Sequence, residues 1–412
     1  MSAVRITRCR ACGSADLRPF LSLGKTPLAD AFVEPEQAGR HDPSYPLEVA
    51  WCAGCTLVQI LHEVPPQRLF VDNYLYFSSF SDDLLAHSRA HAERLIADRG
   101  LDGDSLVVEI ASNDGYLLRN FVEQDIEVLG IDPAPGQAEA ARAIGVPTLA
   151  AFFGVEVARG LVADGLRADV IIANNVMAHV PDLRGFVQGM ALLLADDGVV
   201  TIENPWVRDL VRKGEFDTIY HEHHSYFSCT SVDNLMRDNG LSLNDVEYFP
   251  DLHGGTLRWH CGRQRDVSER VRALLALEAA EGVPSLDYYA SFSERVDETI
   301  ESLLAMLRQR RSSGRRIAAY GAAAKGSTLL NTAGIGTELI EYVVDRNVHK
   351  QGLLVPGVHI PIRSPEALLQ DQPDDVLVLA WNFAPEIVAQ QAEYVSRGGT
   401  FIVPIPEPTV IT

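Results

Sequence analysis

The sequence predicts an α/β protein with a small N-terminal module and two Rossmann-like domains. Three observations support this: two Cys-x-x-Cys pairs near the N-terminus, a stretch in which short apolar runs alternate with helical patterns, and a second such stretch after it. At 412 residues the chain is too long for one ordinary core, since domains hold roughly 150 residues each. We expect a module over residues 1–72, domains over 73–265 and 315–412, and a helical connector over 266–314.

Composition and charge exclude several classes of protein. No run of roughly 18 apolar residues exists to span a bilayer, and residues 1–10 lack the apolar core of an export signal. The chain is therefore expected to be soluble and cytoplasmic. With 35 basic against 56 acidic residues the net charge is -21, which disfavours nucleic acid and anionic membranes as partners. An anionic ligand would need a locally basic pocket.

The N-terminal module is expected to bind zinc. Cys9, Cys12, Cys52 and Cys55 form two Cys-x-x-Cys knuckles, and four thiolates satisfy a tetrahedral zinc ion without leaving an open coordination position. Reduced, metal-free thiols and a redox pair are the alternatives. A module of about 70 residues buries little apolar surface alone, so the ion would be structural.

The first alternating stretch predicts a parallel sheet with an antiparallel edge. After the aromatic segment Tyr74 to Ser79, an amphipathic run from Asp82 to Arg99 predicts a helix that leads into it. Parallel strands with helices on both faces are expected at 106–110, 127–131, 147–151, 169–173 and 198–202. The runs 241–249 and 256–261 flank a turn-rich loop and predict an edge hairpin. This layout resembles that of class I S-adenosylmethionine methyltransferases.

Polar residues follow the first strands of this sheet. The loop Glu109-Ile-Ala-Ser-Asn-Asp-Gly115 ends the first strand, and Asp132 ends the second, where a carboxylate can bind ribose hydroxyls. The loop resembles the glycine-rich motif of S-adenosylmethionine enzymes, although Ala111 stands where many of them have glycine. An NAD-binding domain and a domain without nucleotide are the alternatives. The expected donor-binding residues are Glu109, Ala111, Asn113, Gly115, Asp132, Asn174 and Asn175.

The segment Tyr220 to Ser228 holds three imidazoles, one carboxylate and two phenols in nine residues. It follows the predicted strand at 198–202, and catalytic groups in open parallel sheets gather beyond the carboxyl ends of strands. Acid/base chemistry is therefore expected. A metal ligand set and a surface loop are the alternatives.

The second alternating stretch predicts another nucleotide-type unit. Strands are expected at 315–320, 340–344, 375–380 and 399–403. Gly321, Ala323 and Gly326 fit the dinucleotide fingerprint with alanine second. Amide hydrogens at that helix start would bind a pyrophosphate, and a tight turn without ligand is the alternative. The expected contacts to this ligand are Gly321, Lys325, Gly326, Ser327, Thr328, Asp345, Asn347 and Lys350.

Nearly the full chain resembles the zinc-containing sugar C-methyltransferases that act on dTDP-linked 4-keto deoxysugars in antibiotic biosynthesis. Four features carry the resemblance in order: the cysteine knuckles, the Glu109 loop, Thr218-Ile-Tyr-His-Glu-His223, and Tyr320-Gly-Ala-Ala-Ala-Lys-Gly-Ser-Thr-Leu-Leu-Asn331. The resemblance implies that the middle domain holds S-adenosylmethionine and the C-terminal unit the sugar nucleotide. By matching position it implies a base, His223, with Tyr220, Glu222, His179 and Tyr76 around the sugar.

These residue types suit C-methylation on chemical grounds. A hydrogen beside a ketone is acidic enough for a positioned imidazole to remove near neutral pH, and phenols can donate hydrogen bonds to the enolate oxygen. Methylation at carbon 3 is expected as the commoner outcome in the family, and carbon 5, also beside the carbon 4 ketone, is the alternative. An NAD-dependent sugar-nucleotide oxidoreductase and a non-catalytic sugar-nucleotide-binding protein are the rival functions. The sequence does not identify the other substituents of the sugar or the oligomeric state. It is compatible with a monomer.

Overall fold

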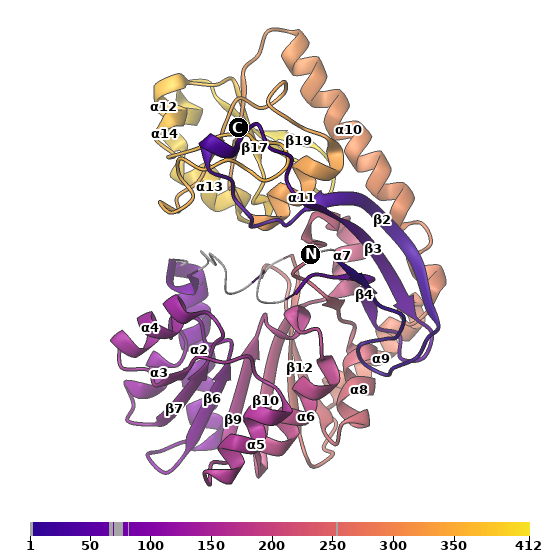
Figure 1. The fold of residues 1–412 in the computed structure, drawn as a ribbon, viewed down its shortest axis with the longest axis vertical. Coiled ribbons are helices and arrows are strands. Elements are labelled where there is room, and N and C mark those ends of the chain that lie inside the picture. Colours follow the sequence, from indigo (N-terminus) through magenta and orange to yellow (C-terminus); the bar gives the residue numbers. More distant parts are fainter. Residues whose placement is uncertain (1–2, 66–68, 70–76, 81, 253) are drawn as a thin grey trace.

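Two α/β lobes lie at opposite ends of the molecule, and the N-terminal sheet and the long helix α10 (Phe292–Ser312) lie along one side of it (Figure 1). This computed structural model describes residues 3–65, 69, 77–80, 82–252 and 254–412. The two lobes correspond to the two predicted Rossmann-like domains.

The N-terminal module contains a four-stranded sheet in the order β11-β4-β3-β2. Strands β2 (Leu17–Pro27), β3 (Ser44–Cys52) and β4 (Val58–Ile60) pair antiparallel in chain order. The fourth strand, β11 (Ser225–Tyr226), belongs to the histidine-rich segment and pairs antiparallel with β4. Smaller elements of the module are β1 (Val4–Arg5), η1 (Pro35–Gln37) and β5 (His62–Glu63). The module therefore takes up a strand from much later in the chain.

The middle lobe contains a seven-stranded sheet in the order β12-β13-β10-β9-β6-β7-β8. Its five strands β6 to β10 run parallel, and β13 pairs antiparallel with both β10 and β12. The predicted parallel sheet with an antiparallel edge hairpin is confirmed. The strands are β6 (Leu106–Ile110), β7 (Glu127–Ile131), β8 (Thr148–Leu149), β9 (Ala168–Asn174), β10 (Leu194–Pro205), β12 (Ser242–Phe249) and β13 (Thr256–Gly262).

Alternating side chains of the central strands build two separate cores. Val108 and Ile171 belong to the core on one face of the sheet, and Val107 and Val170 to the core on the other face. Successive side chains of a strand point to opposite faces, so strands covered on both sides must be apolar throughout. The helices of this lobe are α2 (Asp82–Arg99), α3 (Arg119–Val122), α4 (Pro135–Ala143), α5 (Val155–Ala163), α6 (Leu183–Leu193), α7 (Val207–Lys213) and α8 (Cys229–Asp238), with η2 (Ser78–Phe80), η3 (Met177–His179) and η4 (Phe216–Thr218) between them.

The C-terminal lobe contains a six-stranded sheet in the order β16-β15-β14-β17-β18-β19, parallel except for β19. The segment predicted as a helical connector holds α9 (Glu269–Glu281), η5 (Leu286–Tyr289) and α10. The elements of the lobe are β14 (Ile317–Tyr320), α11 (Ala324–Ala333), β15 (Val343–Val344), β16 (Ile362–Arg363), α12 (Ala367–Asp371), β17 (Asp375–Val378), η6 (Trp381–Phe383), α13 (Ala384–Gln390), α14 (Ala392–Ser396), β18 (Thr400–Val403) and β19 (Thr409–Ile411).

One apolar core joins the N-terminal module to both lobes. It contains Ile60 of β4, Phe216 of η4, Leu303 of α10 and Leu329 of α11. The chain between β2 and β3 also reaches the C-terminal lobe, where Val33 exchanges two backbone hydrogen bonds with Leu354 at 3.0 and 2.8 Å. The three parts are therefore fixed against one another where the histidine-rich segment lies.

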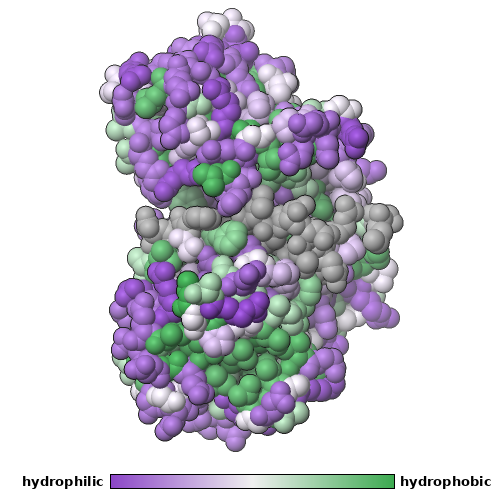
Figure 2. All heavy atoms as spheres, turned by 60° about the vertical axis from the view of Figure 1, so that its left-hand side comes forward, coloured by the Kyte–Doolittle hydropathy of each residue, from purple (hydrophilic) through white to green (hydrophobic). Residues whose placement is uncertain are grey.

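On one face of the molecule the two lobes differ in surface character. On the face shown in Figure 2, hydrophobic residues gather on the middle lobe, and the C-terminal lobe is mostly hydrophilic. No helix in the described ranges has both the length and the apolar character needed to cross a membrane.

Candidate functional site

The histidine-rich segment is held between the middle lobe and the N-terminal sheet. The backbone N–H of His224 donates to the carbonyl of Ala178 in η3 at 2.7 Å, and the His224 carbonyl accepts from Ile60 of β4 at 3.1 Å. Just after β11, Ser228 caps helix α8 through reciprocal hydrogen bonds with Ser231. The segment is therefore anchored at its middle and at its C-terminal end, and such anchoring restricts the positions of its side chains.

His223 lies in a defined hydrogen-bonded geometry. Its Nδ1 is 2.8 Å from the Thr218 carbonyl oxygen, and its Nε2 is 3.0 Å from the hydroxyl oxygen of Tyr220. A carbonyl oxygen can only accept, so Nδ1 carries the hydrogen and Nε2 accepts from Tyr220. The Tyr220 and His179 rings lie 4.1 and 4.7 Å from the His223 ring, centroid to centroid. Nε2 is thus the basic nitrogen of this cluster.

The other imidazoles around His223 are neutral at neutral pH. Burial lowers the pKa of His179 to about 4 and that of His221 to about 4. The pKa of His224 is likewise far below its usual range because the ring is buried and Arg10 lies nearby. Within Tyr220 to Ser228, His223 is half-buried, whereas His221 and His224 are buried.

Glu222 is a buried acid whose pKa is raised by its surroundings. Burial raises its pKa well above the usual range, and the nearby carboxyl group of Asp30 adds to the shift, while Lys350 opposes it. A protonated carboxyl can donate a hydrogen bond. The structure thus brings together His223, Tyr220, Glu222 and His179 of the predicted catalytic residues, and the fifth, Tyr76, lies outside the described residues.

The predicted donor loop follows β6 in an unusual backbone conformation. Ala111 and Asn113 have φ of 58° and 49°, and Gly115 has φ of 80°. Glycine adopts this left-handed region freely and asparagine tolerates it, whereas alanine is strained there, so glycine would suit position 111 better than Ala111. The carboxylate of Asp132 accepts from the N–H of Asn113 at 2.9 Å and from that of Ala134 at 2.8 Å. Asp132 therefore braces the loop from the neighbouring strand β7.

Buried acceptor atoms at the carboxyl ends of β6 and β9 fit a ligand with several hydrogen-bond donors. Glu109 Oε2 and Asn174 Oδ1 are buried and have no hydrogen-bond partner among the described residues. Burial, together with the charges of Asp132 and Asp114, raises the pKa of Glu109 well above its usual range. An ammonium or hydroxyl group, both present in S-adenosylmethionine, would satisfy these acceptors. Asn175 lies beside them with φ of 52° and donates its N–H to the Glu203 carbonyl at 2.8 Å.

The predicted pyrophosphate turn packs tightly against the two residues that follow β17. A Cβ on Gly321 would lie 2.9 Å from the Ala380 Cβ, and one on Gly326 would lie 2.7 Å from the Leu379 Cβ. Both positions therefore require glycine. Asp345 braces this turn as Asp132 braces the donor loop, because its carboxylate accepts from the N–H groups of Ala322 and Asn347, each at 2.7 Å.

Two predicted substrate-binding lysines lie at this turn. Lys325 Nζ donates to Asn382 Oδ1 at 2.6 Å and lies 4.4 Å from the Trp381 ring centroid. Lys350 Nζ donates to the Ala322 carbonyl at 2.8 Å and lies 3.9 Å from Asp30 Oδ1.

The two predicted hydroxyl contacts, Ser327 and Thr328, differ from the lysines in position. Ser327 and Thr328 are both buried in α11, and the Thr328 hydroxyl donates to the Ala324 carbonyl of the same helix at 3.2 Å. The side-chain amines of Lys325 and Lys350, by contrast, bond to residues outside α11.

Sequence reasoning missed three residues that adjoin the site: Asp30, Asp217 and Trp381. The Trp381 indole N–H donates to Asp217 Oδ2 at 2.7 Å, which links the C-terminal lobe to η4. Each of the three contacts a distant part of the chain and carries no local pattern. The only available signal was that Asp217 immediately precedes the Thr218 to His223 stretch.

The four predicted cysteine ligands converge in the N-terminal module. Their Sγ atoms all lie within 4.8 Å of one another, with Cys9 to Cys55 at 3.5 Å and Cys12 to Cys52 at 3.6 Å. A tetrahedral zinc ion with Zn–S bonds of about 2.3 Å requires separations of about 3.8 Å. Gln59 of β4 donates to Cys9 Sγ at 3.2 Å, a supporting contact typical of metal sites. The donor set fits zinc, and the prediction of a zinc-binding cluster of four cysteines is confirmed.

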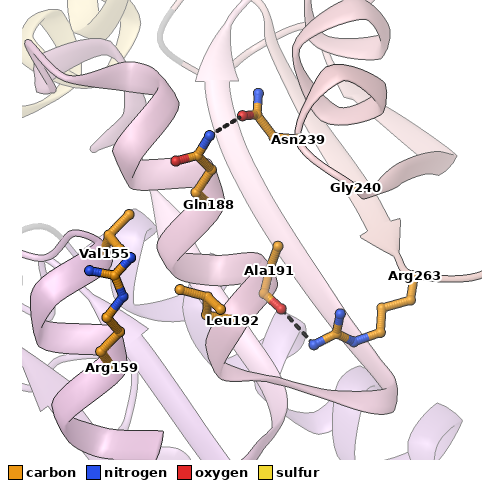
Figure 3. Close-up of a pocket in the computed structure, with 8 residues that line it drawn as sticks. All are labelled: Val155, Arg159, Gln188, Ala191, Leu192, Asn239, Gly240 and Arg263. Carbon is orange, nitrogen blue, oxygen red and sulfur yellow. Dashed lines mark hydrogen bonds between the residues drawn. The ribbon is translucent and has the colours of Figure 1, made fainter.

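A separate cavity of ≈ 360 Å³ opens beside α6 and contains none of the predicted site residues (Figure 3). Gln188 and Asn239 join across it through a hydrogen bond of 3.1 Å. Its lining residues are Val155, Arg159, Gln188, Ala191, Leu192, Asn239, Gly240 and Arg263.

Three family descriptions match consecutive parts of the chain: a zinc binding domain over residues 9–70, a methyltransferase domain over 85–246, and a C-methyltransferase C-terminal domain over 251–406. The chain is 36% identical over 410 residues to the C-methyltransferase NovU of Streptomyces niveus, covering 99% of this chain and 97% of that one. It is 26% identical over 180 residues to a ubiquinone biosynthesis O-methyltransferase of Azorhizobium caulinodans, covering 42% of this chain and 63% of that one. Among solved structures, the magnesium protoporphyrin IX methyltransferase of Synechocystis PCC 6803 with bound SAM aligns at a TM-score of 0.34 and 16% identity, over 48% of this chain and 89% of that one.

Proposed function

The chain belongs to the family of zinc-containing, S-adenosylmethionine-dependent C-methyltransferases that includes NovU, and we propose that it methylates carbon 3 of a dTDP-linked 4-keto-6-deoxysugar. Such a reaction belongs to the biosynthesis of antibiotic deoxysugars. The geometry of His223 is the observation that carries the proposal, because C-methylation beside a ketone needs a base whose lone pair is directed and whose other nitrogen is fixed.

Proton removal falls to His223. Its Nδ1–H is held by the Thr218 carbonyl, so Nε2 takes the proton from the carbon beside the ketone, and the electrons of that C–H bond form the enolate. S-adenosylmethionine supplies an electrophilic methyl group on a sulfonium, which the enolate carbon attacks as the carbon–sulfur bond breaks. The proton stays on the imidazole and later passes to solvent.

Neutral donors around His223 suit the negative charge that develops on the ketone oxygen. The Tyr220 hydroxyl donates to Nε2 at 3.0 Å, so it has to turn away before Nε2 can take the proton from carbon, and it can then donate to the enolate oxygen. Burial raises the pKa of Glu222 and lowers that of His179 to about 4, and both shifts favour the neutral forms, which do not oppose enolate formation.

The two ligands would occupy different lobes. Glu109, Asp132 and Asn174 would contact S-adenosylmethionine, while Lys325 and Lys350 would contact the diphosphate of the sugar nucleotide. The net charge of -21 disfavours long-range attraction of an anionic substrate, so local positive charges such as these lysines would have to bind its diphosphate.

The test is methyl transfer itself. Protein is incubated with S-adenosylmethionine and a dTDP-4-keto-6-deoxyhexose, and mass spectrometry follows a gain of one methylene mass. Proton NMR of the product then shows whether the hydrogen on carbon 3 or that on carbon 5 is lost. We expect His223→Asn to abolish transfer while S-adenosylhomocysteine still binds, and His41→Asn, at an exposed histidine, to leave both unchanged. Near-normal turnover by the His223 variant would contradict the assignment of the base.

A further inference from the structure

The hydrogen bond between Trp381 and Asp217 is a polar link between the C-terminal lobe and the segment that precedes His223. It is 2.7 Å long, and Asp217 is completely buried. A buried carboxylate is costly unless it is paired, so this bond fixes both partners strongly. Asp217 lies in η4, and η4 also packs against α11 of the C-terminal lobe, since Phe216 and Leu329 share one core.

The position of η4 determines the orientation of the base. Asp217 is followed by Thr218, whose carbonyl oxygen holds His223 Nδ1 at 2.8 Å. A displacement of η4 would therefore move or release the group that selects the tautomer and direction of the imidazole. Two hydrogen bonds and one peptide unit connect the C-terminal lobe to the His223 ring. The first bond joins Trp381 to Asp217, and the second joins the Thr218 carbonyl to His223.

From these contacts we propose that Asp217 is a positioning residue for His223, and that the C-terminal lobe sets the direction of the base through Trp381. The inference rests on the proposed function, because it takes His223 as the base. Lys325 of α11 lies over the same Trp381 ring at 4.4 Å. The turn that would bind the diphosphate and the tryptophan that holds Asp217 are therefore in direct contact, and the base is oriented by the lobe that would carry the sugar.

Four variants separate positioning from general stability. Trp381→Phe removes the N–H together with the five-membered ring of the indole, and keeps an aromatic ring beneath Lys325. Asp217→Ala breaks the same bond from the other side, whereas Asp217→Asn keeps an oxygen that can accept. The matched control is Trp206→Phe, because the Trp206 N–H donates to Glu278 Oε1 at the same distance of 2.7 Å but has no link to Thr218.

The readout is hydrogen exchange at the carbon beside the ketone. The dTDP-4-keto sugar is incubated in D2O with enzyme and S-adenosylhomocysteine, so proton removal is observed without methyl transfer. We expect Trp381→Phe and Asp217→Ala to slow exchange on the order of 10- to 100-fold at saturating sugar, as a misplaced catalytic group does. Affinities for dTDP and S-adenosylhomocysteine should stay near wild type, and Asp217→Asn and Trp206→Phe should exchange at close to the wild-type rate.

Several results would overturn the inference. Wild-type exchange in both Trp381→Phe and Asp217→Ala would mean that the bond does not position the base. An equal loss in Asp217→Asn would mean that the charge beside Lys325 matters and not the position. An equal loss in Trp206→Phe would reveal a general effect of stability. If the wild-type protein itself neither exchanges nor methylates 4-keto sugars, the proposed function fails and the inference falls with it.

Discussion

The acid Glu215 provides a quantitative test of how burial shapes the boundary between the lobes. Only 2% of the residue is exposed, and its Oε1 has no hydrogen-bond partner in the part of the chain that the structure describes. Burial raises its pKa from 4.5 to about 8, although Lys213 and Lys325 partly oppose the shift. The carboxyl group is therefore protonated in the folded protein at neutral pH.

The sign and size of the effect follow from this shift. Below about pH 4.5 the group is neutral in both the folded and the unfolded chain, and its favourable contribution is complete. Between about pH 4.5 and about pH 8 only the unfolded chain releases the proton, so the free energy of unfolding falls as pH rises. At about 1.4 kcal/mol per pKa unit, the loss amounts to at most about 5 kcal/mol across this window. Glu215→Gln is always neutral and should not show it.

The assay is urea unfolding followed by tryptophan fluorescence at several pH values across that window. We expect wild-type protein to lose stability relative to Glu215→Gln as pH rises, with the two curves separating steadily up to about pH 8. Glu269→Gln is the matched control, because Glu269 has an exposed side chain in α9. If wild type and Glu215→Gln respond to pH in parallel, the carboxyl group is not buried as a neutral acid and the reasoning is wrong.

Three further outcomes test the zinc cluster, the nucleotide turn and the donor loop. Metal analysis should find about one zinc per chain, and Cys12→Ser should lower the melting temperature of the N-terminal region; unchanged folding after zinc loss would contradict a structural role. Lys325→Ala should weaken binding of a dTDP sugar by roughly 1.5–3 kcal/mol, because one charge-assisted hydrogen bond is lost. The affinity for S-adenosylmethionine should stay nearly unchanged. Titration with both ligands checks this, and a selective loss of S-adenosylmethionine would mean that the two sites are assigned the wrong way round. Ala111→Gly should relieve a left-handed strain of about 1–2 kcal/mol and so raise the melting temperature slightly; a lowered value would show that the surrounding loop compensates for Ala111.

The central strands were predictable from sequence, and the sheet edges were less so. The observed bounds of β6 and β7 equal the predicted 106–110 and 127–131, because strands buried on both faces are apolar throughout. Strand β10 is longer than the predicted 198–202 since it has partners on both sides. Edge strand β8 has one partner and shrinks to Thr148–Leu149 from the predicted 147–151.

Some parts of the candidate site were also predictable from sequence and others were not. Loops at strand ends and the histidine-rich segment carry their chemistry in consecutive residues, so the sequence alone indicates them as candidates. Asp30 and Trp381 reach the site only through the packing of separate domains, and no local pattern marks such contacts. Pairing of β11 with β4 was likewise unpredictable, because a strand of two residues has no measurable periodicity.

The pairing of β11 with β4 makes the zinc module a structural support for the histidine-rich segment. Since β11 completes a sheet whose other strands precede the middle lobe, a methyltransferase domain expressed alone would lack the surface on which His223 is ordered. During synthesis the module leaves the ribosome first, so the edge of β4 stays unpaired until the segment that contains β11 has been synthesised. An exchange of middle domains between relatives therefore succeeds only if the β4 edge and its β11 strand are transplanted as a pair.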